Sequence, residues 1–484
     1  MPWDWLGSRL PILRRLRSGE QAPVPPSAAP ATSARIARSE KTRPVGGVVI
    51  PRERHPISRK SISPNALRVL YKLRDAGFAA YLVGGAVRDL LVGIQPKDFD
   101  VATDAKPEQV RQLFRNCRLI GRRFRLAHVI FGPEIIEVAT FRAGGDDGSG
   151  DRAMVDGRIV RDNVYGNIEE DAERRDFTAN ALYYTIEDFS VRDFVGGFAD
   201  VEQRLLRLIG DPEERYREDP VRMLRAVRLA TKLDFEIEAK TAAPIPRLAG
   251  LLVDASPARL FDELLKLLLG GHSEASVAAL DRFGLLDAVL PATAQALRVP
   301  AQQPLRRLLD AALAQTDRRV REERSVSPAF LFAALLWPAV VPRFQASLAA
   351  GHETQVAWGI AADEVLIEQV RRAALPRRIS TPMLEIWQLQ SRFEHLQRKR
   401  VVRLLEHPRF RAAYDFLALR ADVEPEAAAL FAFWREVEGK PESVDVALRR
   451  VAESGGDTPA PRKRRRRGGR GRRPQDSPRS ETPA

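Results

Sequence analysis

One stretch near the start of the chain constrains the fold more than any other. Residues 78–83, FAAYLV, form an apolar run that is typical of a buried strand, and two adjacent glycines follow it. The next segment, AVRDLLVG, has the pattern of a short helix, and DFDVAT at residues 98–103 has the pattern of a second strand. A strand, a glycine turn, a helix and a second strand in this order predict a small mixed α/β domain.

Two aspartates, Asp98 and Asp100, lie two positions apart in the second predicted strand. Side chains alternate along a strand, so both carboxylates are expected on one face, where they repel unless a cation lies between them. Oxygen ligands without a His or Cys cluster suit Mg²⁺ (or Mn²⁺), which binds through one or two carboxylates and substrate phosphates. An isolated Asp-x-Asp pair is common on exposed strands, but the glycine turn ahead of it makes the combination more specific. Glu137, on a neighbouring predicted strand, is a candidate third carboxylate.

The glycine turn itself, Gly84 and Gly85, is a candidate phosphate site, because backbone N–H groups at such a turn can approach phosphate oxygens. Arg88 lies within the first turns of the helix that follows. The segment lacks the G-x-x-x-x-G-K-[ST] pattern, which excludes a P-loop nucleotide site.

A third segment, RRDFTANALYY from Arg174, is predicted as a helix. Asp176 and Asn180 are four positions apart and would share one face of it, with Arg175 beside them. The apolar residues among them would face the core.

A fourth segment, REDPVRMLRAVRLA, begins with Asp219 as a predicted helix cap. Arg222, Arg225 and Arg228 follow at three-residue steps and would form an arginine ridge along one face of the helix. On its own such a ridge would be a solvated surface. After a phosphate turn and a metal pair, it indicates contacts to nucleotide and nucleic acid.

The charge of the chain is concentrated at its ends. The net charge is +14, and residues 1–60 carry twelve Lys or Arg against four Asp or Glu, a net of +8. The tail RKRRRRGGRGRR at residues 462–473 adds +9, which leaves −3 for the rest. Basic ends on a nearly neutral core indicate a polyanionic partner, either nucleic acid or an anionic membrane. Arg464, Arg465, Arg466 and Arg467 are therefore candidate RNA-binding residues.

Targeting signals are weak. Cys117 is the only cysteine, which excludes an intramolecular disulfide and fits a reducing compartment. No apolar run is expected to approach the roughly 20 residues of a membrane span. The first 18 residues are too charged for a signal peptide, and three interpretations of them stay open: a disordered basic leader, an amphipathic helix on a membrane surface, or an organellar transit peptide.

Together, LVGGAVRDLL with KDFDVAT, then RRDFTANALYY and EDPVRMLRAVRLA, resemble the class II nucleotidyltransferases, which comprise bacterial poly(A) polymerases and CCA-adding enzymes. The resemblance is strong from residue 61 to about 270. Residues 119–130, LIGRRFRLAHVI, match the pattern apolar-apolar-Gly-Arg/Lys-Arg/Lys-Phe-x-apolar-His of the poly(A) polymerases, and the Arg-rich tail is similar to theirs. The sequence is therefore identified as a member of the poly(A) polymerase branch.

The resemblance implies a fold and a division of the chain. We expect a nucleotidyltransferase head with a small mixed sheet and helices, followed by a mostly α-helical neck, body and leg, with disordered basic ends. The expected boundaries are a leader and linker at 1–60, with order beginning near Ser63, the catalytic head at 61–205, a nucleotide- and RNA-binding neck at 206–270, a body at 271–453 and an Arg-rich tail at 454–484. Residues 143–158, rich in Gly and Asp, are expected to form a mobile loop.

The resemblance also assigns roles residue by residue. It implies Asp98 and Asp100 as metal ligands, to which the predicted strand position adds Glu137 as a third, and the expected catalytic residues are Asp98, Asp100 and Asp176. Asp219 and Arg222 match the pair that reads the incoming base. The full set of expected nucleotide-binding residues is Gly84, Gly85, Arg88, Arg175, Asn180, Asp219, Arg222 and Arg225.

The activity that follows is template-independent addition of AMP from ATP to RNA 3′ ends by two-metal transfer, in polyadenylation, RNA processing and decay. Expected partners are RNA 3′ ends, ATP, RNA-decay proteins and a membrane surface at the N-terminus. The expected location is the cytoplasm, with peripheral contact to the inner membrane. Two alternatives stay open: a CCA-adding tRNA nucleotidyltransferase, and a non-catalytic RNA-binding protein that keeps the fold.

Overall fold

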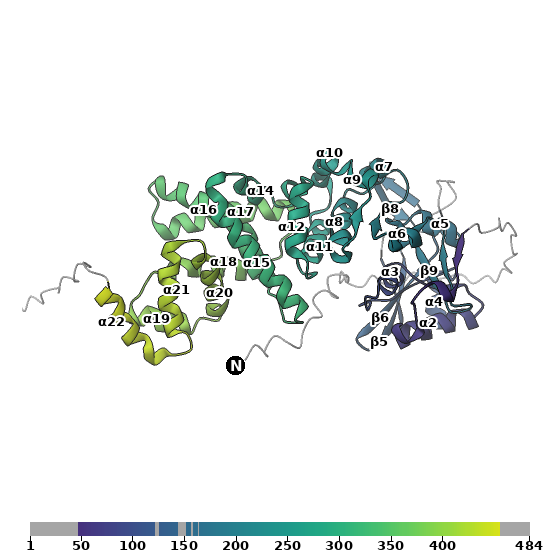
Figure 1. The fold of residues 1–484 in the computed structure, drawn as a ribbon, viewed down its shortest axis with the longest axis horizontal. Helices are drawn as coiled ribbons and strands as arrows, with labels where there is room; N and C mark the ends of the chain where they lie inside the picture. The colour runs from purple at the N-terminus through teal and green to yellow at the C-terminus, as the bar shows by residue number, and fades with distance from the viewer. Residues whose placement is uncertain (1–46, 122–124, 144–151, 156–157, 163, 455–484) are drawn as a thin grey trace, which may run out of the picture.

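The computed structural model describes residues 47–121, 125–143, 152–155, 158–162 and 164–454. The molecule is elongated, with a mixed α/β head at one end and helices that follow one another towards the other end (Figure 1). The expected fold class, a nucleotidyltransferase head followed by a mostly helical chain, is confirmed. The first 46 residues, the tail after residue 454 and the candidate residues Arg464 to Arg467 lie outside the described ranges.

The head is built on an eight-stranded sheet in the order β1-β10-β9-β2-β3-β6-β5-β4. The β3–β6 pair is parallel, and the other neighbours run antiparallel. In sheet order the strands are Val48–Ile50, Val191–Asp193, Leu182–Thr185, Ala80–Val83, Asp100–Thr103, Glu134–Thr140, Leu126–Phe131 and Cys117–Ile120.

The two faces of this sheet differ: one packs on the main apolar core, and the other holds the polar candidate residues. Leu82 and Val101 are in register on β2 and β3 and are fully buried in the main core, where α2 (Pro64–Asp75) and α4 (Pro107–Leu113) pack. Their neighbours Val83 and Asp100 are also in register and point to the opposite face. The polar candidate residues therefore have a packed apolar layer behind them.

The remaining elements of the head pack on both faces of the sheet: Val87 and Phe198 belong to the main core, and Ala172 lies with Val83 in a separate cluster on the second face. The helix α2 begins as predicted, because the Ser63 hydroxyl accepts hydrogen bonds from the N–H groups of Asn65 and Ala66 at 3.1 and 3.4 Å. The other elements are α3 (Gly85–Leu91), the hairpin β7 (Arg152–Val155) and β8 (Arg158–Asp162), α5 (Ile168–Glu173), the 3₁₀ turn η3 (Thr178–Asn180) and α6 (Gly197–Glu202).

The rest of the described chain is almost entirely helical. The neck holds β11 (Leu205–Leu206), α7 (Pro212–Glu218), α8 (Val221–Leu233), β12 (Glu236–Ile237), α9 (Ala239–Ala242), α10 (Ile245–Leu248) and α11 (Pro257–Leu268). The following helices are α12 (Ser273–Arg282), α13 (Leu285–Val289), α14 (Pro291–Leu297), α15 (Gln303–Arg321), α16 (Pro328–Ala349), α17 (Thr354–Arg372), α18 (Arg377–Phe393), α19 (Arg398–Leu405), α20 (Phe410–Ala421), α21 (Pro425–Val437) and α22 (Val444–Ser454).

One of these helices corrects the expectation about apolar runs. The helix α16 is long and apolar enough to cross a membrane, by length and composition alone. Much of it is buried inside the protein: Trp337 is 1% exposed, and the helix packs against α14, α15, α17 and α18. A core helix of a large helical domain accounts for this pattern.

Three other expectations about local structure were wrong. Order begins before Ser63, because β1 pairs with β10 and the side chains of Ile50 and Ile57 are buried. Residues 152–155, expected in a mobile loop, form β7, and the residues between 144 and 151 lie outside the described ranges. The segment from Arg174 is no helix but the turn η3 followed by strand β9. The neck also contains the short parallel pair β11–β12.

Candidate active site

The aspartate pair lies at the start of β3. Asp100 is the first residue of the strand, and Asp98 is exposed just before it. Phe99, between them, is buried in the main core at 5% exposure. This alternation directs both carboxylates away from the core, on the side of the sheet that Val83 shares.

A row of registered residues extends this side of the sheet. Asp100 on β3 is opposite Glu137 on β6, and Glu137 is opposite His128 on β5. The His128 Nε2 atom lies 3.3 Å from Glu137 Oε2. The structure thus brings Glu137 beside Asp100, as expected, but also gives its carboxylate a histidine partner.

This donor set fits a hard divalent cation only in part. Within the described ranges, no three His, Cys, Asp or Glu side chains converge as a metal site. The oxygens of Asp98 and Asp100 suit Mg²⁺, which accepts two carboxylates when substrate phosphates complete its coordination. Glu137 as a third ligand stays a prediction.

The glycine turn lies between two arginines. Gly84 has a φ of +77°, which favours glycine, and it directly precedes α3. A Cβ atom at Gly84 would lie 3.5 Å from Arg175 Nη1, and one at Gly85 would lie 3.5 Å from Arg88 Nη2. The turn therefore places glycine backbone next to positive charge, which suits a phosphate site.

The two arginines are held differently. Arg88 is 3% exposed, and its guanidinium donates to Asp89 Oδ1 from Nε at 2.9 Å and from Nη2 at 2.5 Å, while Nη1 donates to Asn180 Oδ1. Lys232 of α8 donates to the other oxygen of Asp89 at 3.0 Å. Each guanidinium nitrogen of Arg88 thus has a partner within the protein. In this arrangement Arg88 stabilises the glycine turn and does not point a nitrogen at a ligand.

Arg175 keeps one nitrogen for the turn. Its Nε and Nη2 atoms donate to Asp171 Oδ2 at 3.2 and 2.9 Å, and Nε also donates to the Tyr183 hydroxyl at 2.9 Å. In the described part of the chain, Nη1 has no hydrogen-bond partner and lies beside Gly84. Asp171 and Tyr183 were not predicted; the four-residue spacing from Asp171 to Arg175 is the signal that would have indicated the first.

Asp176, an expected catalytic residue, is bound on both oxygens. Oδ2 accepts from Arg225 Nε at 2.9 Å and from its Nη2, and Oδ1 accepts from Asn180 Nδ2 at 3.0 Å and from the Phe177 N–H at 2.8 Å. Burial alone would raise the pKa of Asp176, but Arg225 and these hydrogen bonds hold it well below its usual range. Asp176 and Asn180 do meet, although through a turn and not a helix.

The predicted arginine ridge on α8 is tied to acids. Arg222 Nη1 donates to Glu218 Oε2 at 2.7 Å, Arg225 reaches Asp176, and Arg228 Nε donates to Glu263 Oε2 at 2.9 Å. Glu263, on α11, is 5% exposed and was not predicted. The helix α8 thus connects the head to α11 through ion pairs.

Asp219 is also placed differently from its prediction. Pro220, not Asp219, precedes α8 as its cap, and Asp219 ends α7. Its Oδ1 still accepts from the Val221 N–H at 3.3 Å, and Oδ2 accepts from Arg259 at 2.7 Å. Asp219 and Arg222 therefore stand on either side of the start of α8, near enough in the chain to act on one base.

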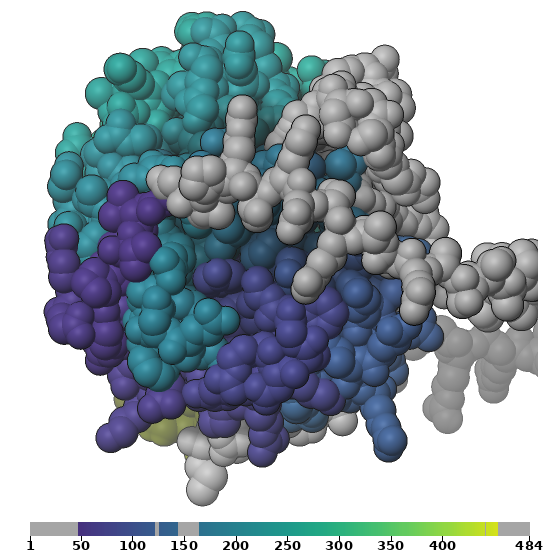
Figure 2. All heavy atoms as spheres, turned by 90° about the vertical axis from the view of Figure 1, so that its right-hand side faces the viewer, coloured from purple at the N-terminus to yellow at the C-terminus, as the bar shows by residue number. Residues whose placement is uncertain are grey.

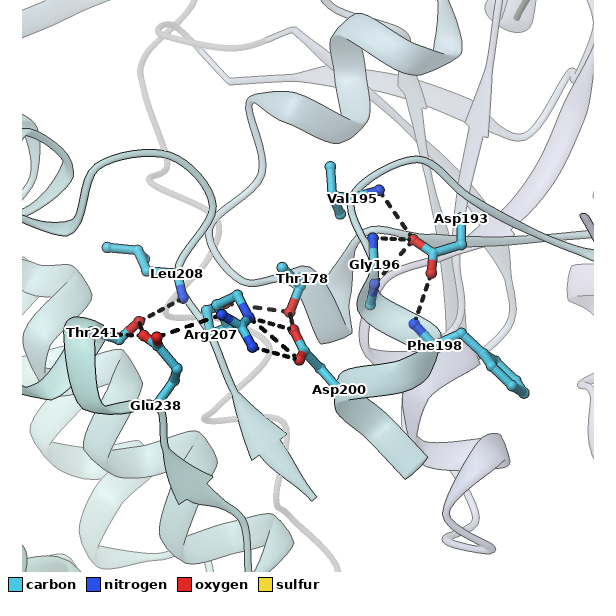
Figure 3. Close-up of polar contacts among 11 residues, drawn as sticks. Thr178, Asp193, Val195, Gly196, Phe198, Asp200, Arg207, Leu208, Glu238 and Thr241 are labelled. Atoms are coloured by element: carbon cyan, nitrogen blue, oxygen red, sulfur yellow. Dashed lines mark hydrogen bonds and ion pairs between the residues drawn. The ribbon is translucent and has the colours of Figure 1, made fainter. Parts of the chain in front are cut away.

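A second polar network ties the turn η3 to the neck (Figure 3). Asp200 accepts from the Thr178 hydroxyl at 2.6 Å and from Arg207 Nε at 3.1 Å, and Arg207 also contacts Glu238 at 3.4 Å. Glu238 accepts from the Thr241 N–H at 2.8 Å.

Viewed from the head end, the purple and blue atoms of the head lie below teal atoms of the neck (Figure 2).

A groove of about 1000 Å³ lies elsewhere, between the end of α8, β12, α9 and α12. Val227, Ala230 and Thr231 of α8 line it. Arg225 and Lys232 of the same helix instead reach the head. The groove is therefore separate from the candidate nucleotide site.

Comparison with known proteins agrees with this geometry. Residues 80–207 match the poly A polymerase head domain, residues 234–297 the probable RNA and SrmB-binding site of polymerase A, and residues 350–471 the polymerase A arginine-rich C-terminus. The crystal structure of a CCA-adding enzyme from Bacillus stearothermophilus in complex with CTP superposes with a TM-score of 0.52 at 26% identity, covering 81% of this chain and 94% of that one.

Curated relatives are more similar. The poly(A) polymerase I of Salmonella typhi is 51% identical over 426 residues, which cover 87% of this chain and 91% of the relative. That of Haemophilus influenzae is 45% identical over 409 residues, 83% of this chain and 90% of the relative. On this evidence the chain belongs to the poly(A) polymerase I family.

Proposed function

We propose that the chain adds AMP from ATP to RNA 3′ ends, without a template, where the end of β2 and the start of β3 bring together the Gly84–Gly85 turn, Asp98 and Asp100. Template-independent polyadenylation is the activity of the family, and the 51% identity over 91% of the Salmonella typhi relative is the observation that carries it. The chain is a polynucleotide adenylyltransferase that uses ATP and a divalent metal, as the family does.

In the reaction, the RNA 3′-hydroxyl attacks the α-phosphate of ATP and pyrophosphate leaves. Asp98 and Asp100 would hold divalent cations, Mg²⁺ or Mn²⁺, which lower the pKa of the hydroxyl and neutralise the leaving oxygens. The Gly84–Gly85 turn would present glycine backbone to the triphosphate, and Arg175 would add a positive charge there. Holding these groups in fixed positions favours in-line attack.

The two arginine-bearing segments have different proposed roles. Asp219 and Arg222 would select the base by exchanging their present contacts, Asp219 with Arg259 and Arg222 with Glu218, for hydrogen bonds to it. Asp176 acts through Arg225 and Asn180 and does not meet substrate, since both of its oxygens are occupied. The catalytic role that the resemblance implied for Asp176 stays a prediction.

The RNA runs from the head along the neck. Residues 234–297 match a model described as a probable RNA and SrmB-binding site, and we propose that this region and the Arg-rich tail bind the RNA. We further propose that the protein works in the cytoplasm, where RNA-decay proteins are its partners, and that the basic N-terminus can contact the inner membrane.

Nucleotide preference tests the proposal. Purified protein is incubated with Mg²⁺, an oligo(A) primer and each nucleoside triphosphate in turn. We expect ATP to give long extension products and the other three nucleotides to give few or none. Absence of extension with ATP would refute the proposed activity and favour an RNA-binding protein without catalysis.

A further inference from the structure

We propose that Asp171 and Tyr183 are positioning residues that hold Arg175 with its Nη1 atom against the triphosphate of ATP. The inference deepens the proposed function and rests on it, since it takes the Gly84–Gly85 turn as the place of the triphosphate. Asp171 lies outside the motifs described above, and Tyr183 lies within RRDFTANALYY but had no assigned role.

The three side chains form a closed triad. The Tyr183 hydroxyl donates to Asp171 Oδ2 at 2.7 Å and accepts from Arg175 Nε at 2.9 Å. The same Asp171 oxygen accepts from Arg175 Nη2 at 2.9 Å. Two of the three guanidinium nitrogens are therefore fixed, and the planar group can no longer rotate. The third nitrogen, Nη1, lies 3.5 Å from the position that a Cβ atom of Gly84 would occupy.

The supports of the triad are rigid. Tyr183 is fully buried on β9, in register with Val83, the last residue before the glycine turn. Its ring packs edge-on against Tyr81 and Phe194, with centroids 6.1 and 6.0 Å apart. Asp171, at 6% exposure, also accepts from the Arg142 N–H at 3.3 Å. Both partners of Arg175 are thus buried, and Tyr183 lies on the strand that pairs with the residue before the glycine turn.

The charges in the triad are stable. Burial raises the pKa of Tyr183 far above its usual value, so its hydroxyl keeps the proton that it donates to Asp171. Burial works against the charge of Arg175, but Tyr183 and Asp171 outweigh it and raise the pKa of the guanidinium. A fixed positive group is suited to a phosphate oxygen when its remaining nitrogen, unpaired among the described residues, lies beside a glycine turn.

A purely structural ion pair is the competing explanation, with Arg175 serving only to attach α5 to the sheet. Such a pair would need no particular orientation of Nη1. The two explanations differ in what they predict for ligands with and without the β- and γ-phosphates, because AMP lacks the groups that Nη1 would contact.

The test compares ATP and AMP binding by the full chain, measured by calorimetry without RNA. The variants are Tyr183→Phe, which removes only the hydroxyl, and Asp171→Asn, which keeps the shape of the side chain. In each variant we expect ATP to bind roughly ten-fold more weakly, since a hydrogen bond to a charged group is disturbed, and AMP affinity to stay unchanged. The matched control is Tyr184→Phe, a buried tyrosine next along β9 on the other face of the sheet, which should leave both affinities unchanged.

Two results would overturn the inference: unchanged ATP affinity in both variants, or an equal loss of ATP and AMP affinity, which a distorted fold produces. The proposed function fails separately. Wild-type protein that prefers ATP over AMP but extends no RNA would refute polyadenylation while the role of the triad stands.

Discussion

Asp100 and Asp176 are both carboxylates of the head, but their surroundings differ. The side chains of Asp98 and Asp100 point away from the core at the start of β3. The two oxygens of Asp176 instead accept hydrogen bonds from Arg225, Asn180 and a backbone N–H. At the scale of single residues, we propose a chemical role for the first pair and a structural one for Asp176.

Removing one charge from the pair Asp98 and Asp100 should abolish catalysis and leave the stability of the fold unchanged. We expect Asp98→Asn and Asp100→Asn to lower AMP transfer by several orders of magnitude, because the cation loses a ligand. Thermal unfolding should change little, since loss of a like charge relieves repulsion. Primer extension and unfolding curves measure the two effects. Asp75→Asn, an exposed carboxylate paired with the neighbouring Arg74, is the matched control and should behave as wild type. Wild-type turnover in either site variant would contradict the assignment.

For Asp176→Asn we expect the reverse pattern, a loss of stability of about 2 kcal/mol at neutral pH. The pKa of Asp176 is lower in the folded than in the unfolded chain. Its stabilisation is therefore complete above the unfolded pKa of about 4 and declines as the pH falls through the lower folded pKa. Unfolding free energies of wild type and variant should converge in that acidic window. A difference that is constant from neutral to strongly acidic pH would show that the ion pair is not responsible.

At the scale of elements, the sequence predicts best where pattern and packing agree. The strand, glycine turn, helix and strand around Gly84 were all predicted, since each has a local signal. The segment after Arg174 was not, because strand β9 forms only through pairing with β2 and β10. Likewise, β1 has three residues and pairs with residues 191–193, far along the chain. Contacts of this kind leave little trace in a local pattern.

The helix α6 supplies a prediction at this scale. The Asp193 carboxylate accepts from the N–H groups of Val195, Gly196 and Gly197 with Oδ1 and of Phe198 with Oδ2 (Figure 3). Asp193→Asn keeps one acceptor oxygen but presents an amide N–H₂ to a backbone donor. We expect a loss of about 1 kcal/mol in the free energy of unfolding, measured by urea denaturation. Unchanged stability would show that water replaces the cap.

At the scale of the whole molecule, the candidate site and the strongest basic segment are far apart in the sequence. The described core carries the site at the head, and the arginines of residues 462–473 follow the last described helix, α22. We propose that RNA that reaches the head is also bound by the tail. The sequence shows the charge of the tail, but its structure lies outside the described ranges.

Deletion of residues 460–484 should leave an active enzyme that binds RNA more weakly. Each contact of the tail with a phosphate releases counterions, at a slope of roughly −0.7 per contact for single-stranded RNA. The intact protein should show the steeper salt dependence of affinity, by a similar margin for unrelated RNA sequences. Equal slopes for both forms would show that the tail does not touch RNA.

The most direct test of the central claim is the length of the product on two primers. Wild-type protein with ATP and CTP is given an oligo(A) primer or a tRNA that lacks its CCA end, and products are resolved by size. A poly(A) polymerase should extend both primers with long runs of A and incorporate little C. Addition of three nucleotides to the tRNA, with no extension of oligo(A), would contradict this account and identify a CCA-adding enzyme.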